Sequence, residues 1–204
     1  MADLSRHLPL SNRAAQDETS VTGDRRQALA EVVRQADALA HDGSAHDGPA
    51  HDGPAHDGPA HDGPAHDGQA HDGPAHDGPA AARFLAEARL DREFAGRPLP
   101  EIADAIAAGA ARSIRALTDA VRAVLALAGD RPVDLDPVTT GSVALYAVGR
   151  ASFDRRAVVG GCTLRATDAG WEFGRGPERA APARQILEFL LGLGDVPPPL
   201  TTRR

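Results

Sequence analysis

The residues with the clearest capacity for chemistry are eight histidines in a five-residue repeat. The segment 41–80 holds eight His-Asp-Gly units, most of them HDGPA, whereas the whole chain has nine histidines. Imidazole and carboxylate groups are transition-metal ligands, so many copies on one segment could bind Zn, Ni or Cu ions. The candidate metal ligands are the repeat histidines: His41, His46, His51, His56, His61, His66, His71 and His76.

The period of this repeat argues against a regular structure. Five residues match neither the 3.6-residue turn of a helix nor the two-residue period of a strand, and the Gly-Pro steps disfavour both. We therefore expect a disordered segment over 41–80 that binds metal weakly, because ordering a loose chain costs entropy. Its near-identical copies also indicate tandem duplication. An expansion without a role, a metal-buffering segment and a spacer all stay open.

Outside the repeat, no pattern of side chains predicts an active site. His7 is the only other histidine and lies in the leader, so a histidine-based catalytic site is not expected. Cys162 is the only cysteine, which excludes an intrachain disulfide, and we interpret it as a small buried hydrophobe. Asp134 and Asp136 are interpreted as solvated loop residues, and Trp171 as a core anchor.

Composition narrows the possible partners. The formal net charge is -7, to which the eight repeat aspartates contribute -8. All 22 basic residues are arginine, a bias typical of GC-rich genomes, and they are spaced among acids with only 3% aromatic residues, unlike a nucleic-acid groove. No apolar run approaches the roughly 20 residues that span a bilayer, and the N-terminus lacks the apolar core of a secretory signal. We expect a cytoplasmic protein without nucleic-acid or membrane partners; a homo-oligomer stays open.

Apolar residues recur at helical spacing on both sides of the repeat. Residues 24–40 predict an amphipathic helix that follows a mobile leader over 1–23. A second helix is predicted at 79–96, and a third helical block at 101–128, where Gly109 is a candidate bend or break. Because removal of the repeat would leave two helical segments with a tight connection, we interpret the repeat as an insertion into a helical hairpin.

The pattern changes after a proline-punctuated connection at 131–138. The next segment, 139–153, fits a short helix and a strand equally well. Two-residue alternation predicts a β-hairpin over 161–174, with GRGP at 174–177 as the turn that leaves it. A last helix is predicted at 182–191. The hairpin and this helix would bury each other's apolar faces as a small α/β unit.

One segment of this unit also resembles a known family. Residues 158–194 contain a Leu-x-Ala-Thr-Asp run, a tryptophan, a Gly-x-Gly-Pro step and a Pro-Ala helix start. They resemble the C-terminal part of the mycothiol-dependent maleylpyruvate isomerase-like proteins of actinobacteria. The matching positions are Gly161, Leu164, Ala166, Thr167, Asp168, Trp171, Gly174, Gly176, Pro177, Pro182, Ala183, Leu187 and Gly192.

The resemblance implies a DinB-type four-helix bundle in front of this unit, with a metal held by histidines and an acid beside a Cys-Pro-Gly-Trp segment. This chain departs from that pattern. Its one cysteine and one tryptophan both lie in the C-terminal unit, and Ala181 stands where the family has glycine. The predicted helices carry no histidine; His41 directly follows the first helix and is the one candidate remnant ligand. The resemblance therefore implies ancestry and argues against carrying the activity over.

Taken together, the sequence predicts an α+β protein: a mainly helical, bundle-like part and a small C-terminal hairpin-plus-helix unit, interrupted by a disordered repeat. The first functional hypothesis is a degenerate relative of the isomerase-like family without its metal-dependent activity. The second is metal buffering through the repeat, and the third an active thiol-dependent metalloenzyme of that family. The predicted segments are 1–23 leader, 24–40 helix, 41–80 repeat, 81–130 helical part, 131–196 C-terminal unit and 197–204 tail.

Overall fold

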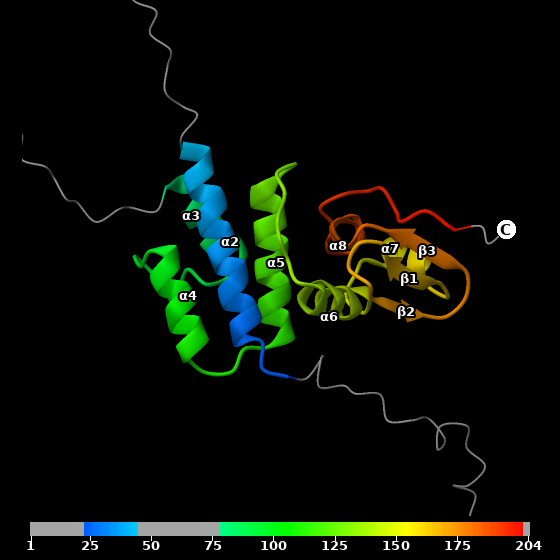
Figure 1. Cartoon of the computed structure of the whole chain (residues 1–204), viewed down its shortest axis with the longest axis horizontal. Coiled ribbons are helices and arrows are strands. Elements are labelled where there is room, and N and C mark those ends of the chain that lie inside the picture. The colour runs from blue at the N-terminus through cyan, green and yellow to red at the C-terminus, as the bar shows by residue number, and fades with distance from the viewer. Residues whose placement is uncertain (1–22, 45–77, 202–204) are drawn as a thin grey trace, which may run out of the picture.

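Helices dominate the computed structural model, which describes residues 23–44 and 78–201 (Figure 1). The protein is of the α+β class, mostly helical, with one small sheet. The helical part comprises α2 (Arg26–Ser44), α3 (Pro79–Glu87), α4 (Leu99–Ala108) and α5 (Ile114–Ala128). The C-terminal unit, residues 131–201, comprises α6 (Pro137–Val148), α7 (Phe153–Val159), β1 (Thr163–Ala166), β2 (Glu172–Gly174), β3 (Glu178–Ala181) and α8 (Ala183–Leu191). The predicted leader and most of the predicted disordered repeat, 45–77, lie outside the described residues.

The core of the helical part is the apolar stripe of α2. This helix packs most extensively against α4 and α5, and α3 packs on α5. The stripe expected from the spacing is buried: Leu29, Val32, Val33, Ala36 and Leu39 are all at most 7% exposed. At about 1.5–3 kcal/mol for each large apolar side chain, this burial is the principal stabilising contribution. The amphipathic helix predicted here is confirmed.

Both helices that flank the repeat differ from their predicted limits. The first was expected to end at residue 40, but α2 continues through His41 to Ser44, the first repeat unit. The second was expected to run to Gly96 but ends at Glu87, because Arg89 adopts the left-handed conformation (φ 59°). The amide of Leu90 then donates to the Leu85 carbonyl at 2.9 Å, which closes the helix end without a glycine.

Two further helix boundaries have local causes. Gly109 does break the long helical block, and Ser113 caps the start of α5 by accepting a hydrogen bond from the Ala116 amide at 3.3 Å.

The ambiguous segment after the connection is the helix α6. Asp136 caps it, because its Oδ1 accepts from two backbone amides at 2.9 Å, and Pro137 fits the first turn.

The sheet contains the predicted hairpin and one unpredicted strand. β1 pairs antiparallel with β2 and parallel with β3, giving the order β2-β1-β3. β3 reads Glu-Arg-Ala-Ala, which has no apolar alternation and gave no strand signal. The predicted tail also joins this edge: the Ala180 amide donates to the Pro199 carbonyl, and the Thr201 amide to the Glu178 carbonyl. Residues 199–201 are thus hydrogen-bonded to β3.

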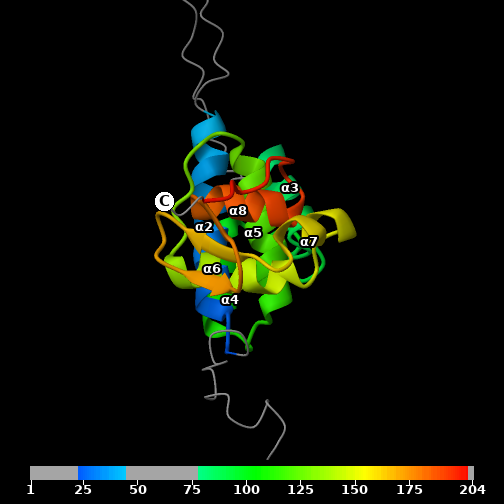
Figure 2. The ribbon, with the colours of Figure 1, turned by 90° about the vertical axis from the view of Figure 1, so that its right-hand side faces the viewer.

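Two helices connect the helical part to the sheet. α6 packs against α5 and α8, and α8 also contacts β1. Figures 1 and 2 show α6 and α8 as a layer between α5 and the sheet. Within the described ranges, no helix has the length and apolar character needed to cross a bilayer.

Candidate functional site

Of the predicted metal ligands, only His41 lies within the described residues. It sits in the last turn of α2 and is 71% exposed at the side chain, with Nδ1 2.8 Å from the Asp37 carbonyl oxygen and 3.4 Å from Asp37 Oδ1. It therefore belongs to the helix rather than following it, which corrects the sequence prediction. The other seven candidates fall in the segment that is not described: His46, His51, His56, His61, His66, His71 and His76.

In the described part of the chain, few side chains that could bind a metal or take part in catalysis lie close together. Across 23–44 and 78–201, no group of three or more histidine, cysteine, aspartate or glutamate side chains is placed to hold a metal ion. Cys162 is half-buried rather than buried as predicted, and its sulfur lies 4.0 Å from the Val158 carbonyl oxygen. The loop acids Asp134 and Asp136 are exposed, as expected, although Asp136 has the additional role of capping α6.

The residues that carry the family resemblance have structural roles in this fold. Asp168 Oδ1 accepts a hydrogen bond from the Ala183 amide at 2.8 Å, so the aspartate tethers the start of α8 to the hairpin. Gly174 and Gly176 have φ values of 104° and 111°, and a Cβ on either would lie 2.3 Å or 2.0 Å from a backbone carbonyl oxygen. Only glycine allows this close approach.

Trp171 packs against the core, as predicted, and is also part of an exposed apolar surface. It is half-buried and stacks on Phe173, with ring centroids 5.5 Å apart and an interplanar angle of 17°. A Cβ on Gly141 would lie 3.1 Å from Trp171 Cγ, so this glycine lets the indole rest on α6. Next to the rings, Val138 and Leu145 of α6 are 63% and 43% exposed. We call these four side chains, Val138, Leu145, Trp171 and Phe173, the α6–β2 face.

The α6–β2 face is hollowed and almost free of charge. It surrounds a depression of about 410 Å³, lined by ten residues of which only Glu172 is charged. Successive side chains of a strand point to opposite faces, so Glu172 leaves the sheet on the side away from Phe173. An uncharged surface that presents a stacked tryptophan and phenylalanine has the composition of the anchor regions in protein interfaces.

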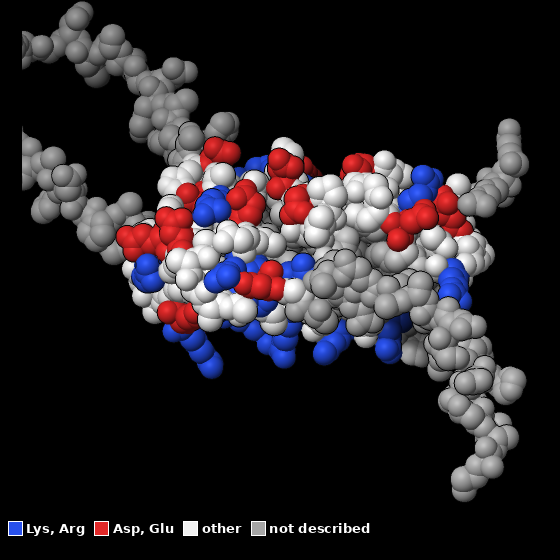
Figure 3. Space-filling model, turned by 60° about the horizontal axis from the view of Figure 1, so that its bottom comes forward, with Lys and Arg blue, Asp and Glu red and all other residues white. Residues whose placement is uncertain are grey.

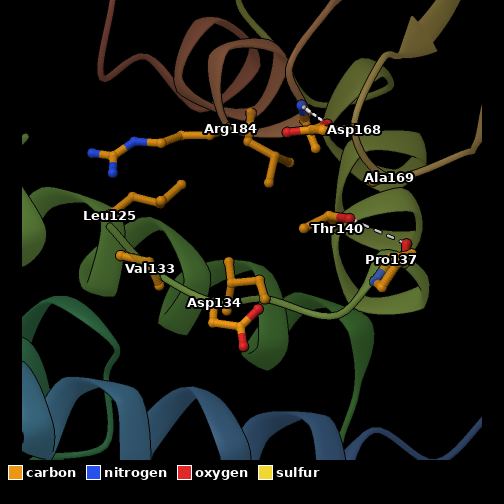
Figure 4. A pocket seen from close by; sticks show the side chains of 11 residues that line it. Leu125, Val133, Asp134, Pro137, Thr140, Asp168, Ala169 and Arg184 are labelled. Carbon is orange, nitrogen blue, oxygen red and sulfur yellow. Dashed lines mark hydrogen bonds between the residues drawn. The ribbon is translucent and has the colours of Figure 1, made fainter. Parts of the chain in front are cut away.

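A second hollow lies on the other side of Thr140 (Figure 4). This inner cavity has a volume of about 290 Å³ between α5, α6, α8 and the hairpin loop, and it shares only Pro137 and Ala169 with the depression of the α6–β2 face. The Trp171 indole nitrogen donates to Thr140 Oγ1 at 3.0 Å. Since Thr140 lines the inner cavity, this hydrogen bond connects the two hollows.

The perturbed carboxyl groups lie elsewhere, at the lower end of the helical part. Asp24 Oδ1 accepts from the Arg26 amide at 3.0 Å and the Arg112 amide at 3.1 Å, and these hydrogen bonds hold the pKa of that carboxyl below its usual value. The side chain of Arg112 likewise lowers the pKa of Glu93, with Nη1 2.8 Å from Oε2. These groups link the residues before α2 and after α3 to the segment before α5, and none of them lines either hollow. Figure 3 shows acidic and basic side chains interspersed on the face it presents.

Comparison with known proteins identifies no similar protein. The chain has no significant match among protein-family models, curated proteins or solved structures. The α6–β2 face was missed by sequence reasoning, because 139–153 was not assigned to a helix and Trp171 was expected only as a core anchor. One signal was present: Val138 and Leu145 are seven residues apart, which places them on one side of a helix.

Proposed function

We propose that the folded part is a non-catalytic binding module, a degenerate relative of the mycothiol-dependent maleylpyruvate isomerase-like proteins, that pairs with a second copy of itself through the α6–β2 face. The observation that carries this proposal is the stacked pair of Trp171 and Phe173 beside the exposed Val138 and Leu145. Contiguous exposed apolar surface of this kind marks a binding site in soluble proteins.

The lack of charge on the face favours a second copy as the partner. In a two-fold symmetric pair the same patch faces itself, so a charge that lies near the symmetry axis also lies near its own copy. Glu172 is the single charged residue that lines the depression, so almost all of the surface that would meet its copy is uncharged.

The proposed ancestry rests on the residues shared with the family and on what they do here. Asp168 holds α8, and Gly174 and Gly176 allow the backbone to close on itself. These roles explain why a relative would keep such residues after losing a metal-dependent activity. Within the described helices, His41 is the one histidine, and its Nδ1 lies 3.4 Å from Asp37 Oδ1.

Sedimentation velocity over a range of protein concentrations tests the proposed pairing. The wild-type chain should associate, and Leu145→Glu should weaken the association at least about tenfold, because it places a charge in the centre of the patch. Phe153→Glu is the matched control: Phe153 is 76% exposed, lies outside the face and should leave association unchanged. A wild-type chain that stays monomeric, or a Leu145→Glu chain that associates normally, contradicts the proposal.

Metal buffering by the repeat is the second candidate function, favoured by the end of α2. There His41 and Asp37 lie four residues apart on one side of the helix, with an imidazole nitrogen 3.4 Å from a carboxylate oxygen. Imidazole and carboxylate are groups that transition metals bind, and the remaining repeat histidines follow this pair directly in the sequence.

Zinc and nickel titrations of the full chain and of a chain lacking 45–77 test this second function. That deletion keeps α2 and α3 intact, because α2 ends at Ser44 and α3 begins at Pro79. Binding that disappears with the deletion supports metal buffering. The absence of binding below millimolar metal contradicts it. Tight, stoichiometric binding that survives the deletion contradicts the non-catalytic proposal instead, and favours an active metalloenzyme.

A further inference from the structure

The sheet has two edges, and only one of them is covered within the described residues. At β3 the tail residues 199–201 are hydrogen-bonded along the edge, whereas β2 pairs with β1 alone and forms the other edge (Figure 1). We propose that two copies join their β2 strands antiparallel across a two-fold axis, so that their three-stranded sheets become one continuous sheet. This inference rests on the proposed pairing through the α6–β2 face and specifies its geometry.

The register of β1 and β2 determines which peptide groups face the open edge. The Ala166 amide donates to the Trp171 carbonyl at 3.0 Å. Hydrogen-bonded pairs alternate along an antiparallel ladder, so the next residue of β2 that bonds to β1 is Phe173. The Phe173 carbonyl therefore points to β1, and the Gly174 amide, on the opposite side of the same trans peptide, points outward. By the same reasoning, the amide and the carbonyl of Glu172 also point outward.

A two-fold axis at Phe173 gives these outward groups partners. Phe173 would face its own copy in a non-hydrogen-bonded pair, and Glu172 would face Gly174 of the second copy in a hydrogen-bonded pair. The Gly174 amide of each copy would then donate to the Glu172 carbonyl of the other copy. An edge strand with unpaired groups of this kind is a template for pairing with another chain.

The charges along β2 fit an antiparallel pair. Glu172 would lie opposite Gly174, which has no side chain, and so would not directly face a like charge. Arg175 directly follows β2, so the basic end of one strand would meet the acidic end of the other. Among the described residues, neither Glu172 nor Arg175 forms an ion pair that would have to be broken.

The aromatic rings would form one row across the axis. Trp171 and Phe173 stack on the side of the sheet that carries α6. Cα atoms of a non-hydrogen-bonded pair are about 4.5 Å apart, so the two Phe173 rings would contact each other. Both copies of α6 would lie on this side, where Val138 and Leu145 are exposed. Joining the edges would therefore bury the α6–β2 face together with the open backbone.

A proline at position 172 tests the role of the edge. The Glu172 amide points away from β1, so Glu172→Pro should keep the fold, which circular dichroism checks, while its ring blocks a second strand. The comparison variant Glu172→Gln loses the same charge but keeps the amide. In sedimentation velocity, the dissociation constant of the proline variant should exceed that of the glutamine variant at least about tenfold.

Disulfide cross-linking tests the register independently of the proline. In a Cys162→Ser chain, which leaves no other cysteine, Phe173→Cys would lie on the axis, within the roughly 4.4–6.8 Å between Cα atoms that a disulfide spans. Glu172→Cys is the matched control, because its two copies would be more than about 8 Å apart, given a rise of about 3.4 Å per residue. Under mild oxidation, Phe173→Cys should form the linked dimer at least about tenfold faster on non-reducing electrophoresis.

The outcomes separate the geometry from the pairing itself. A wild-type chain that stays monomeric overturns both the proposed pairing and the joined edges. If the wild type associates, equal dissociation constants for the two variants at position 172 overturn the joined edges alone. Cross-linking of Glu172→Cys as fast as that of Phe173→Cys overturns the register.

Discussion

The helical part and the C-terminal unit handle apolar surface differently. The described helices α2 to α5 bury their large apolar side chains, whereas all five large hydrophobic side chains that are exposed in the described ranges lie in the C-terminal unit. These exposed side chains are Val138, Leu145, Phe153, Val196 and Leu200. The comparison shows that the large exposed apolar side chains of the described residues are concentrated in the C-terminal unit.

One apolar core runs through both regions, and arginine hydrogen bonds to backbone carbonyls supplement it in each, as from Arg26 to Gly109 at 2.9 Å in the helical part. The helical part relies on the apolar stripe of α2 against α4 and α5. The C-terminal unit is joined by arginine side chains that donate to backbone carbonyls: Arg155 to Gly194 at 2.6 Å, Arg179 to Pro198 at 2.7 Å and Arg184 to Arg131 at 2.6 Å. Hydrogen bonds to a charged group contribute about 1.5–3 kcal/mol each. A small sheet with few buried residues depends on such bonds.

The largest expected effect on stability comes from truncating a buried phenylalanine of the helical part, compared with an exposed one of the C-terminal unit. Phe84→Ala in α3 removes a side chain that is 1% exposed and should lower the free energy of unfolding by about 3–5 kcal/mol. Phe153→Ala in α7, where the ring is 76% exposed, should change it by less than about 0.5 kcal/mol. Urea denaturation followed by circular dichroism measures both. Equal losses in the free energy of unfolding of the two variants would contradict the difference in burial between the two side chains.

The next largest effect on stability is expected from alanine substitutions at two glycines with positive φ. Gly176→Ala would place a Cβ 2.0 Å from the Gly161 carbonyl oxygen at a φ of 111°, so the strand must shift, at a cost of about 3 kcal/mol or more. Gly96→Ala meets no atom within 4 Å at a φ of 72° and should cost only about 1–2 kcal/mol. Hydrogen exchange should show the first loss in β1 and β2. A similar cost for both variants would mean that close backbone approach does not organise the unit.

The smallest effect is the acid sensitivity of the helical part. Asp24 and Glu93 have folded pKa values below their usual 3.8 and 4.5, so the stability they contribute is present above those values and lost as pH falls through the folded ones. Denaturation midpoints should therefore fall below about pH 5. Asp24→Asn keeps a capping oxygen that does not titrate and should reduce this dependence. An unchanged pH profile in that variant would contradict the assignment.

Much of the helical part could be predicted from the sequence, because period and helix-stop residues act locally. The α2 stripe, the break at Gly109 and the hairpin all follow from such signals. The end of α3 could not be predicted, since Arg89 takes a conformation that glycine normally provides. β3 also escaped prediction, because it pairs in parallel with β1 and its four residues carry no alternation.

The candidate site was harder to predict for a physical reason. The repeat histidines stood out by residue type, whereas the α6–β2 face and the inner cavity arise only where α6, α8 and the hairpin meet. Trp171 was expected as a core anchor, and it does pack against the core, but it also lines the exposed depression. Its exposure depends on Gly141, which lets the indole rest on the surface of α6, and nothing local in the sequence links these two residues.

The emission of Trp171 as a function of protein concentration tests directly whether two copies pair through the α6–β2 face. Because it is the only tryptophan and lies in the α6–β2 face, its emission reports whether that face is covered. Pairing through this face predicts that the emission of the wild-type chain shifts to the red on dilution, in step with the dissociation measured by sedimentation. The emission of Leu145→Glu should be red-shifted and independent of concentration. Emission that stays constant while the wild-type chain dissociates would contradict the account, since the copies would then pair through another surface.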